Sequence, residues 1–271
     1  MQSNDQIGLI PGCPALVVDD LSAGYPGNRR AIQQVSFEVD PGERVGVIGP
    51  NGAGKSTLFK ALVGIIPHHS GNISLHGEAC HTSHDMIGYV PQSGAIDWSF
   101  PVTVWDVVMM GRTREIGWLR WSRRHDRERV AAVLEQVGML AYRDRQIGQL
   151  SGGQRQRVFI ARALAQSTDV LLLDEPFSGV DVSAESEIMG TLDRLTADGI
   201  TLVIATHDLQ MASTAFDKLL VLNQTVIGYG RPDEVFQPAI LRAAYGGRVG
   251  VITPGSENGQ REPVMVVVDS H

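Results

Sequence analysis

Cysteine is scarce in this sequence, and the cysteines that are present form no motif. The chain has two, Cys13 and Cys80, which lie far apart and match no zinc-binding or redox spacing. This excludes the disulfide framework of small secreted proteins and indicates a reducing compartment. We interpret both residues as inert thiols.

An excess of basic residues is also missing. The chain carries 23 Lys and Arg against 30 Asp and Glu, which gives a formal net charge of −7. Proteins that bind the phosphate backbone of nucleic acid use clustered positive charge. We therefore expect no nucleic-acid partner.

Long apolar runs are the third absence. No run approaches the roughly 20 residues that a helix needs to cross a bilayer, and residues 1–14 lack the basic and apolar stretches of a secretion signal. We therefore expect a cytoplasmic protein whose membrane association comes through a partner. With 271 residues and 43% hydrophobic content, the chain has ample material for a buried core.

The apolar pattern that is present predicts an α/β fold. Residues 45–48, then glycines, then residues 56–63 have the pattern of a strand, a tight loop and a helix. Residues 170–173 and 202–205 are continuous apolar runs bounded by polar residues. Such runs are typical of strands covered on both faces, as in a parallel sheet between helices.

A mainly helical insertion is expected at residues 93–166. Within it, Val130, Val133, Leu134 and Val137 recur at helical spacing after Asp126, which we interpret as the helix cap. Residues 1–14 and the tail beyond residue 246 look peripheral, and residues 264–268 are a candidate edge strand.

The first chemical motif is a phosphate-binding loop between the first strand and its helix. Its glycines let the backbone curl so that successive N–H groups point at phosphate oxygens, at the positive end of the helix. The lysine is then placed to bridge the β- and γ-phosphates, and the serine hydroxyl to hold Mg²⁺. The motif consists of Gly49, Pro50, Asn51, Gly52, Ala53, Gly54, Lys55 and Ser56, with Thr57 following in the helix.

A pair of carboxylates, Asp174 and Glu175, follows the buried run at 170–173. Ligand groups in open α/β sheets usually lie just past the carboxyl ends of strands. Asp174 is suited to orient the Mg²⁺ shell, and Glu175 to polarise an attacking water, which are adjacent roles in phosphoryl transfer.

A second helix start carries anion-binding groups. Leu150 is followed by Ser151, Gly152, Gly153 and Gln154. The hydroxyl and the glycine N–H groups at a positive helix end suit an anion such as a γ-phosphate. Because the chain already has its own phosphate loop, this second site makes sense if it serves the nucleotide of another chain.

Together these motifs resemble the ATPase subunit of an ATP-binding cassette (ABC) transporter over residues 15–247, leaving residues 1–14 as an extension and 248–271 as a tail. The resemblance implies a P-loop NTPase core of the RecA type with a parallel sheet, an antiparallel β subdomain and a helical signature subdomain. It also implies ATP and Mg²⁺ as cofactors, with two copies stacked head to tail and ATP held between them. The chain is then peripheral, bound through transmembrane permease subunits at the cytoplasmic face of the membrane.

Four further residues take roles from this resemblance. Tyr25 resembles the aromatic residue that stacks on adenine, Gln92 the glutamine that senses Mg²⁺ and the membrane subunit, and His207 the histidine that contacts the γ-phosphate. Asp181 ends Ser-Gly-Val-Asp where many members have Ser-Ala-Leu-Asp. This departure leaves the acid in place and puts only the geometry of the dimer contact in doubt.

The branch of the family is indicated by residues 96–112 and 176–181, which resemble the manganese, zinc and iron importers. The absence of a membrane span also favours an importer, served by an extracellular or periplasmic solute-binding protein. Manganese is the first expectation for the cargo, and zinc or iron the next. Trp98, Phe100, Trp105 and Met109 then belong either to the core or to a groove for a helix of the membrane subunit.

Histidine-rich residues 68–85 suggest no ligand set. The spacing is irregular, so we interpret the side chains as solvated rather than as a metal site. They are His68, His69, His76, His81 and His84, with Cys80 and Asp85.

Three other functions remain as alternatives. An importer ATPase for another solute fits the same motifs. A cytosolic ABC ATPase that remodels nucleic acid or ribosomes needs two cassettes, a long coiled-coil insertion or a basic face, and the sequence has none of them. A non-hydrolysing homologue is disfavoured because Lys55, Asp174, Glu175 and His207 are all present.

Overall fold

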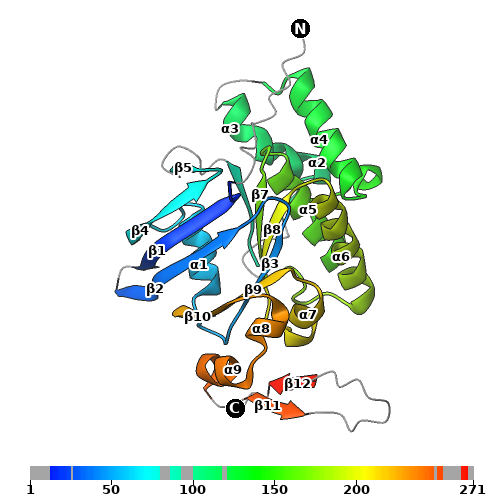
Figure 1. Cartoon of the computed structure of the whole chain (residues 1–271). Coiled ribbons are helices and arrows are strands. Elements are labelled where there is room, and N and C mark those ends of the chain that lie inside the picture. The colour runs from blue at the N-terminus through cyan, green and yellow to red at the C-terminus, as the bar shows by residue number, and fades with distance from the viewer. Residues whose placement is uncertain are drawn as a thin grey trace.

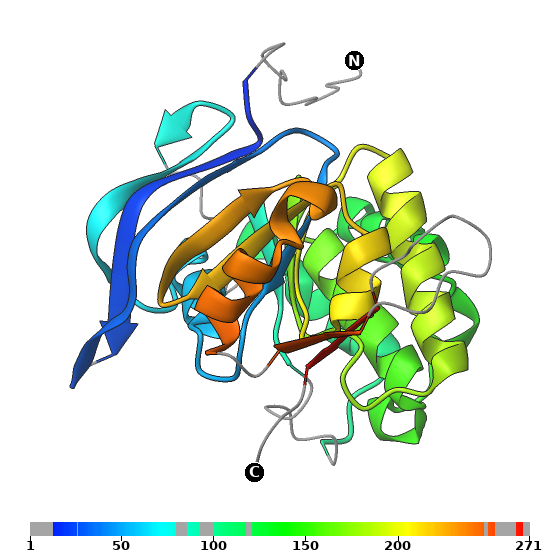
Figure 2. The same ribbon diagram turned by 60° about the horizontal axis from the view of Figure 1, so that its bottom comes forward.

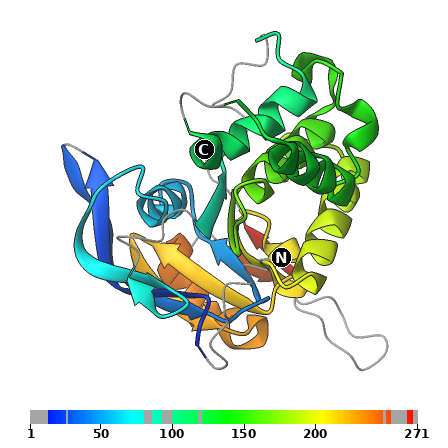
Figure 3. The same cartoon turned by 90° about the horizontal axis from the view of Figure 1, so that it is seen from above.

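The computed structural model describes residues 13–25, 27–79, 86–92, 100–117, 121–246, 249–252 and 264–267. A mixed six-stranded sheet lies between an antiparallel sheet on one side and a group of helices on the other (Figure 1, Figure 3). The prediction of an α/β fold is confirmed.

The six-stranded sheet has the order β10-β9-β3-β8-β7-β6, which gives five pairs of neighbouring strands. All neighbours are parallel except β9 and β10, which are antiparallel. Because the five strands from β9 to β6 are parallel neighbours, their carboxyl ends lie along one edge. The strands are β3 (Arg44–Ile48), β6 (Ile87–Val90), β7 (Val170–Asp174), β8 (Thr201–Ala205), β9 (Lys218–Asn223) and β10 (Thr225–Gly230).

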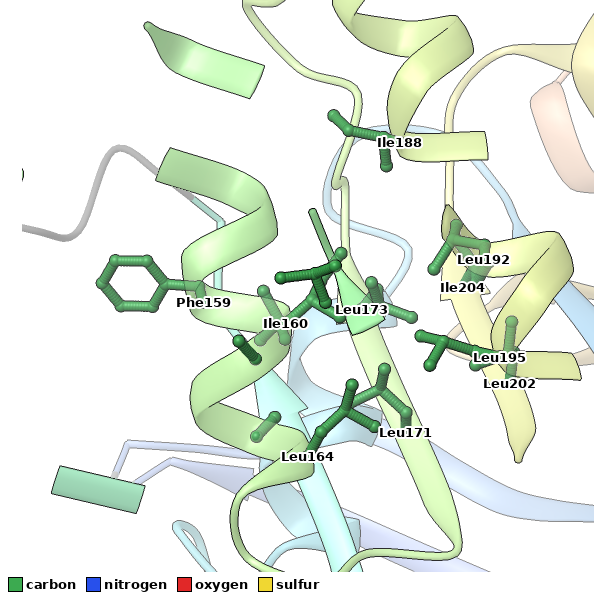
Figure 4. Close-up of a cluster of buried hydrophobic side chains, with 14 of the residues drawn as sticks. Phe159, Ile160, Leu164, Leu171, Leu173, Ile188, Leu192, Leu195, Leu202 and Ile204 are labelled. Atoms are coloured by element: carbon green, nitrogen blue, oxygen red, sulfur yellow. The ribbon is translucent and has the colours of Figure 1, made fainter. Parts of the chain in front are cut away.

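The apolar runs in this sheet supply two separate hydrophobic clusters. In β7, Leu171 and Leu173 belong to one cluster, whereas Val170 and Leu172 belong to the other. Alternate side chains of a strand point to opposite faces, so a continuous run is needed where both faces are covered. Figure 4 shows the first cluster, where side chains from α5 and α6 meet those of β7 and β8.

The antiparallel sheet has the order β2-β1-β4-β5. It lies on the side of the second cluster, to which β1 and β2 contribute Leu16, Leu21, Ile32 and Val35. Its strands are β1 (Leu16–Tyr25), β2 (Asn28–Val39), β4 (His68–Leu75) and β5 (Glu78–Ala79).

The described part of residues 93–166 is helical, while residues 93–99 and 118–120 lie outside the described ranges. Gly153 in α5 lies so close to α6 that a Cβ built on it is 2.6 Å from Ala184 Cβ, which fixes how these two helices pack. The elements are α2 (Val104–Met109), η3 (Met110–Arg112), α3 (Thr113–Ile116), α4 (Arg124–Gln136), η4 (Leu140–Tyr142), η5 (Ile147–Gln149) and α5 (Gly152–Leu164).

Asp126 differs from its predicted role as a helix cap. The α4 helix begins two residues earlier with Arg123 as its N-cap, and the Asp126 carboxylate accepts a hydrogen bond from the Arg123 N–H at 2.9 Å. The same carboxylate pairs with the buried Arg112 guanidinium at 3.3 Å, and that guanidinium also donates to the Ala165 carbonyl oxygen. The sequence pattern could not show this because Arg112 is on a different element.

The remaining helices are α1 (Lys55–Leu62), α6 (Val182–Ala197), α7 (Leu209–Thr214), α8 (Pro232–Val235) and α9 (Pro238–Tyr245). Residues 264–267 do form a strand, β12 (Val264–Val267), but it pairs with β11 (Val249–Ile252) and not with the edge of the central sheet, which corrects that prediction. This ribbon lies beside α7 and α9 (Figure 2). Within the described ranges, no helix has the length and apolar character needed to span a membrane.

Candidate functional site

Four strand ends bring the predicted site residues to one edge of the sheet. The phosphate loop follows β3, His207 follows β8, Asp174 and Glu175 end β7, and Gln92 follows β6. Since these strands are parallel neighbours in the order β3-β8-β7-β6, groups widely separated in the sequence become adjacent. This matches the rule that ligands bind beyond the carboxyl ends of parallel strands.

The phosphate loop turns sharply into α1. Gly54 is the N-cap with a φ of 100°, a left-handed conformation that favours glycine. A Cβ at this position would also lie 2.9 Å from the Ala31 carbonyl oxygen. Local conformation and close packing therefore both require glycine, and the N–H groups of the first turn of α1 are presented at the loop.

Lys55 is held at the centre of this loop. Its side chain is buried, and Nζ donates to the Gly49 carbonyl oxygen at 2.7 Å and to the Pro50 carbonyl oxygen at 3.3 Å. Burial lowers the pKa of the Lys55 ammonium, while the charges of Glu175 and Asp174 act to raise it. The nearby carboxylates thus favour the charged form that burial opposes.

Asp174 is buried at the end of β7, 3% exposed. Burial raises the pKa of its carboxyl, whereas hydrogen bonds from the Ser56 and Tyr89 hydroxyls favour the ionised form. The Tyr89 hydroxyl lies 3.3 Å from Asp174 Oδ2. Sequence reasoning did not single out Tyr89, although its place three residues before Gln92, on the strand that leads to it, was a usable signal.

Glu175 meets two other predicted residues. Its Oε2 accepts a hydrogen bond from Gln92 Nε2 at 3.1 Å and lies 3.7 Å from His207 Nδ1. Glu175 has a φ of 50°, an uncommon value for a residue with a side chain. The structure thus brings together Gln92, Glu175 and His207, which come from three different strand ends.

A shallow pocket adjoins Glu175 on the side of α6 and α7. It is lined by polar groups of the loops after β7 and β8 together with apolar side chains. The lining residues are Glu175, Phe177, Ser178, Glu185, Thr206, His207, Asp208 and Met211.

The second helix start is organised by its own side chains. Ser151 is the N-cap of α5: its hydroxyl accepts from the Gln154 N–H at 3.3 Å, and the Gln154 side chain accepts from the Ser151 N–H at 3.1 Å. Ser151 and Gly152 are exposed. No hydrogen bond or ion pair joins residues 151–154 to residues 49–57 in the part of the chain that the structure describes.

Two further predicted residues lie apart from the Glu175 cluster. Asp181 is the N-cap of α6, where its carboxylate accepts from the Ala184 N–H at 2.9 Å. Tyr25 is exposed at the end of β1, and its hydroxyl lies 3.4 Å from Lys60 Nζ. Both are therefore at the surface and accessible to a ligand or a second chain.

The histidines near β4 require one correction. His76 is buried, and its Nε2 lies 3.5 Å from Asp169 Oδ2, so it is not a solvated side chain. His81, His84, Cys80 and Asp85 lie outside the described residues. Among those that are described, no group of three or more His, Cys, Asp or Glu side chains is placed to hold a metal ion.

Comparison with known proteins identifies the family. Residues 32–178 match the profile of the ABC transporter family. The chain is also 43% identical, over 94% of its length and 98% of the relative, to the manganese transport system ATP-binding protein MntB of Halalkalibacterium halodurans. The chain belongs to the ABC transporter family. It is an ATP-binding subunit, and ATPase activity is typical of this family.

Other relatives and structures agree with this family. The zinc transport system ATP-binding protein TroB of Treponema pallidum is 43% identical over 87% of this chain and 88% of its own length. The ATP-binding cassette MJ1267 in its ADP conformation has a TM-score of 0.74 at 26% identity, covering 86% of this chain and 99% of that one. A chain of an inward-facing ABC transporter of metal-chelate type has a TM-score of 0.79 at 29% identity, covering 93% and 97%. The resemblance drawn from the motifs, with its ATPase core and two subdomains, is confirmed.

Proposed function

We propose that this ABC subunit hydrolyses ATP to drive an importer of divalent transition metal ions, with manganese as the first candidate and zinc or iron next. The observation that carries the proposal is the 43–45% identity to ATP-binding proteins named for manganese and zinc transport, over 85–94% of this chain. A relative named for chelated iron transport, from Yersinia pestis, is 43% identical.

Mg²⁺ fits the oxygen groups at the end of β7. Asp174 is hydrogen bonded to the Ser56 hydroxyl, and Gln92, which follows the neighbouring strand β6, contacts the adjacent Glu175. Mg²⁺ prefers oxygen ligands and uses one or two carboxylates together with phosphate oxygens. Ser56, Gln92 and Asp174 would hold the ion, and Lys55 would neutralise the β- and γ-phosphates. Lys55 and Asp174 are buried, where the local dielectric constant is low. Their electrostatic contacts with the phosphates and with Mg²⁺ would therefore be strengthened.

Glu175 is the residue proposed to polarise the attacking water. Gln92 and His207 both lie at its Oε2, which fixes the carboxylate in one orientation. A second oxygen, Oε1, then remains to accept a proton from water. His207 would contact the γ-phosphate, and Tyr25, exposed at the end of β1, would stack on the adenine.

Two copies of the chain are proposed to assemble head to tail. The exposed Ser151 and Gly152, with Gly153 and Gln154, form a helix start that is suited to a phosphate but is not joined to the phosphate loop of the same chain. The loop that holds Asp181 lies next to it, because Val180 is the nearest side chain to Gly152. Each nucleotide would then lie between the phosphate loop of one copy and residues 151–154 of the other.

A permease would dock on the helical region, at the cytoplasmic face of the membrane, with a solute-binding protein delivering the cargo. Phe100, just before α2, is 62% exposed, whereas Trp105 and Met109 pack partly buried against the core. Trp98 lies outside the described residues. Phe100 is therefore the candidate for the groove, and Trp105 and Met109 stabilise the helix behind it.

Replacing Phe100 with Glu tests this docking site. We expect basal ATPase activity to remain within about twofold of the parent, because the Phe100 side chain is exposed and is not one of the groups assigned to ATP or Mg²⁺. Transport should be lost, since a charge is costly in an apolar contact. The measurement is ATP hydrolysis and solute uptake in membranes that contain the assembled transporter.

Ile65→Glu is the matched control for Phe100→Glu. Ile65 is another exposed apolar side chain, 59% exposed, located after α1 and away from α2. Uptake should persist in this variant. If Phe100→Glu transports as well as Ile65→Glu, the docking site lies elsewhere.

The cargo is tested by uptake of radiolabelled manganese, zinc and iron in cells with and without this chain. We expect accumulation of at least one of these metals to fall when the chain is removed and to return with the parent chain but not with an inactive variant. Unchanged uptake of all three metals, with loss of another solute, would contradict the metal assignment while leaving the ATPase assignment intact.

A further inference from the structure

Arginine and tryptophan are concentrated around the connection between α3 and α4. Residues 112–129 hold seven arginines against three acidic residues, although the chain as a whole has a net charge of −7. Two of the four tryptophans of the chain lie in the same segment. In Figure 1 these helices form one end of the molecule, far from α9 and the β11–β12 ribbon.

The side chains at the start of α4 are directed to solvent. Trp121 is 93% exposed, and the Arg124 side chain is 92% exposed. Arg123 and Arg127 are exposed as well. Phe100 and Met110, which precede this segment in the chain, are two of the other large apolar side chains that are exposed in the described part.

The nearby acids neutralise little of this surface. Asp126 is buried and paired with the buried Arg112, while Glu128 pairs with Arg124 at 2.7 Å. No ion pair joins Arg123 or Arg127 to an acid within the part of the chain that is described. Their charges are also unfavourable for the helix itself, because cations near a helix N-terminus oppose its dipole.

We propose that this surface, defined by Trp121, Arg123 and Arg127, binds anionic lipid headgroups directly, in addition to the contact that a permease makes. Tryptophan prefers the boundary between headgroups and acyl chains, and arginines beside it attract anionic lipid. A protein surface that is only acidic would satisfy the arginines, but it would leave the Trp121 indole, which is 93% exposed, without an apolar environment. A negatively charged membrane supplies both.

The experiment uses the purified full chain and sedimentation with phospholipid vesicles. One set contains phosphatidylcholine alone, and the other contains phosphatidylcholine with phosphatidylglycerol. We expect binding to the anionic vesicles only, and its loss at high salt, since the screening length falls from about 10 Å at 0.1 M to about 3 Å at 1 M. Because the chain is negatively charged overall, general attraction does not explain such binding.

The test variant combines Trp121→Ser, Arg123→Ser and Arg127→Ser. Each arginine near an anionic surface contributes on the order of fivefold in affinity, so the combined variant should bind at least about 20-fold more weakly. The control is Arg231→Ser, whose side chain is 74% exposed before α8 at the other end of the sheet. It should bind as the parent does. Basal ATPase activity should be unchanged in both.

The proposal is overturned if the parent chain does not bind anionic vesicles, or if the combined variant binds them as well as the parent. If the combined variant binds anionic vesicles as well as the parent but loses metal uptake, the surface is assigned to a protein partner instead. Vesicle binding is measured without permease or metal, so it is independent of the proposed cargo. If metal uptake is unchanged in cells that lack the chain, the proposed cargo is wrong, but the vesicle-binding result still holds.

Discussion

Lys55→Ala is expected to abolish most ATP hydrolysis while leaving the fold intact. The lysine is buried in the phosphate loop, where Nζ donates to the Gly49 carbonyl oxygen. Removing a preorganised group that neutralises charge in the transition state costs about 100- to 1,000-fold in rate. We therefore expect at least about a 100-fold fall in kcat, measured as phosphate release at saturating ATP.

The fold of the Lys55→Ala protein is checked by its thermal unfolding and circular dichroism. Arg143→Ala is the control, because Arg143 is exposed and forms an ion pair with its neighbour Asp144. It removes one positive charge without touching the site. A folded Lys55→Ala protein that hydrolyses ATP at the parent rate would show that the phosphate loop has been assigned wrongly.

Glu175→Gln is expected to slow hydrolysis strongly and to trap a dimer in the presence of ATP and Mg²⁺. The amide keeps the size of the side chain and an oxygen that accepts from Gln92, but it cannot take a proton from water. Loss of a positioned general base typically costs about 100- to 10,000-fold. Since residues 49–57 and 151–154 are unchanged, bound ATP should persist between two copies.

Size-exclusion chromatography with light scattering measures the trapped species. We expect the 29.3 kDa chain to double in mass with ATP, and to return to a monomer with ADP. Glu187→Gln is the control, since Glu187 is about half exposed and its carboxylate contacts Arg157 rather than the site. A Glu175→Gln protein that stays monomeric with ATP, even with its permease, would argue against a site shared by two chains.

The order of strands is what the sequence could not supply. The runs at residues 170–173 and 202–205 predict buried strands, because alternate side chains enter two different clusters. The runs themselves do not show which strands lie next to one another in the sheet. Sequence-distant Gln92, Glu175 and His207 meet only because β6, β7 and β8 are parallel neighbours, a non-local outcome of packing.

The sequence pattern also could not predict contacts between side chains on different helices and strands. Asp126 has the spacing of a cap, but its position is decided by Arg123 and the buried Arg112. His76 belongs to an irregular row of histidines, yet the turn after β4 places it next to Asp169, which directly precedes β7. Tyr89 reaches Asp174 across two neighbouring strands.

By itself the sequence determined the groups whose chemistry depends on consecutive residues. The phosphate loop, the Asp174–Glu175 pair and the start of α5 are local, because a tight turn into a helix fixes its own N–H groups through glycine conformation and helix capping. The tertiary structure alone decided which of these local groups share a site. Parallel pairing aligned four strand ends at one edge, whereas the start of α5, on a helix outside that sheet, was left facing solvent.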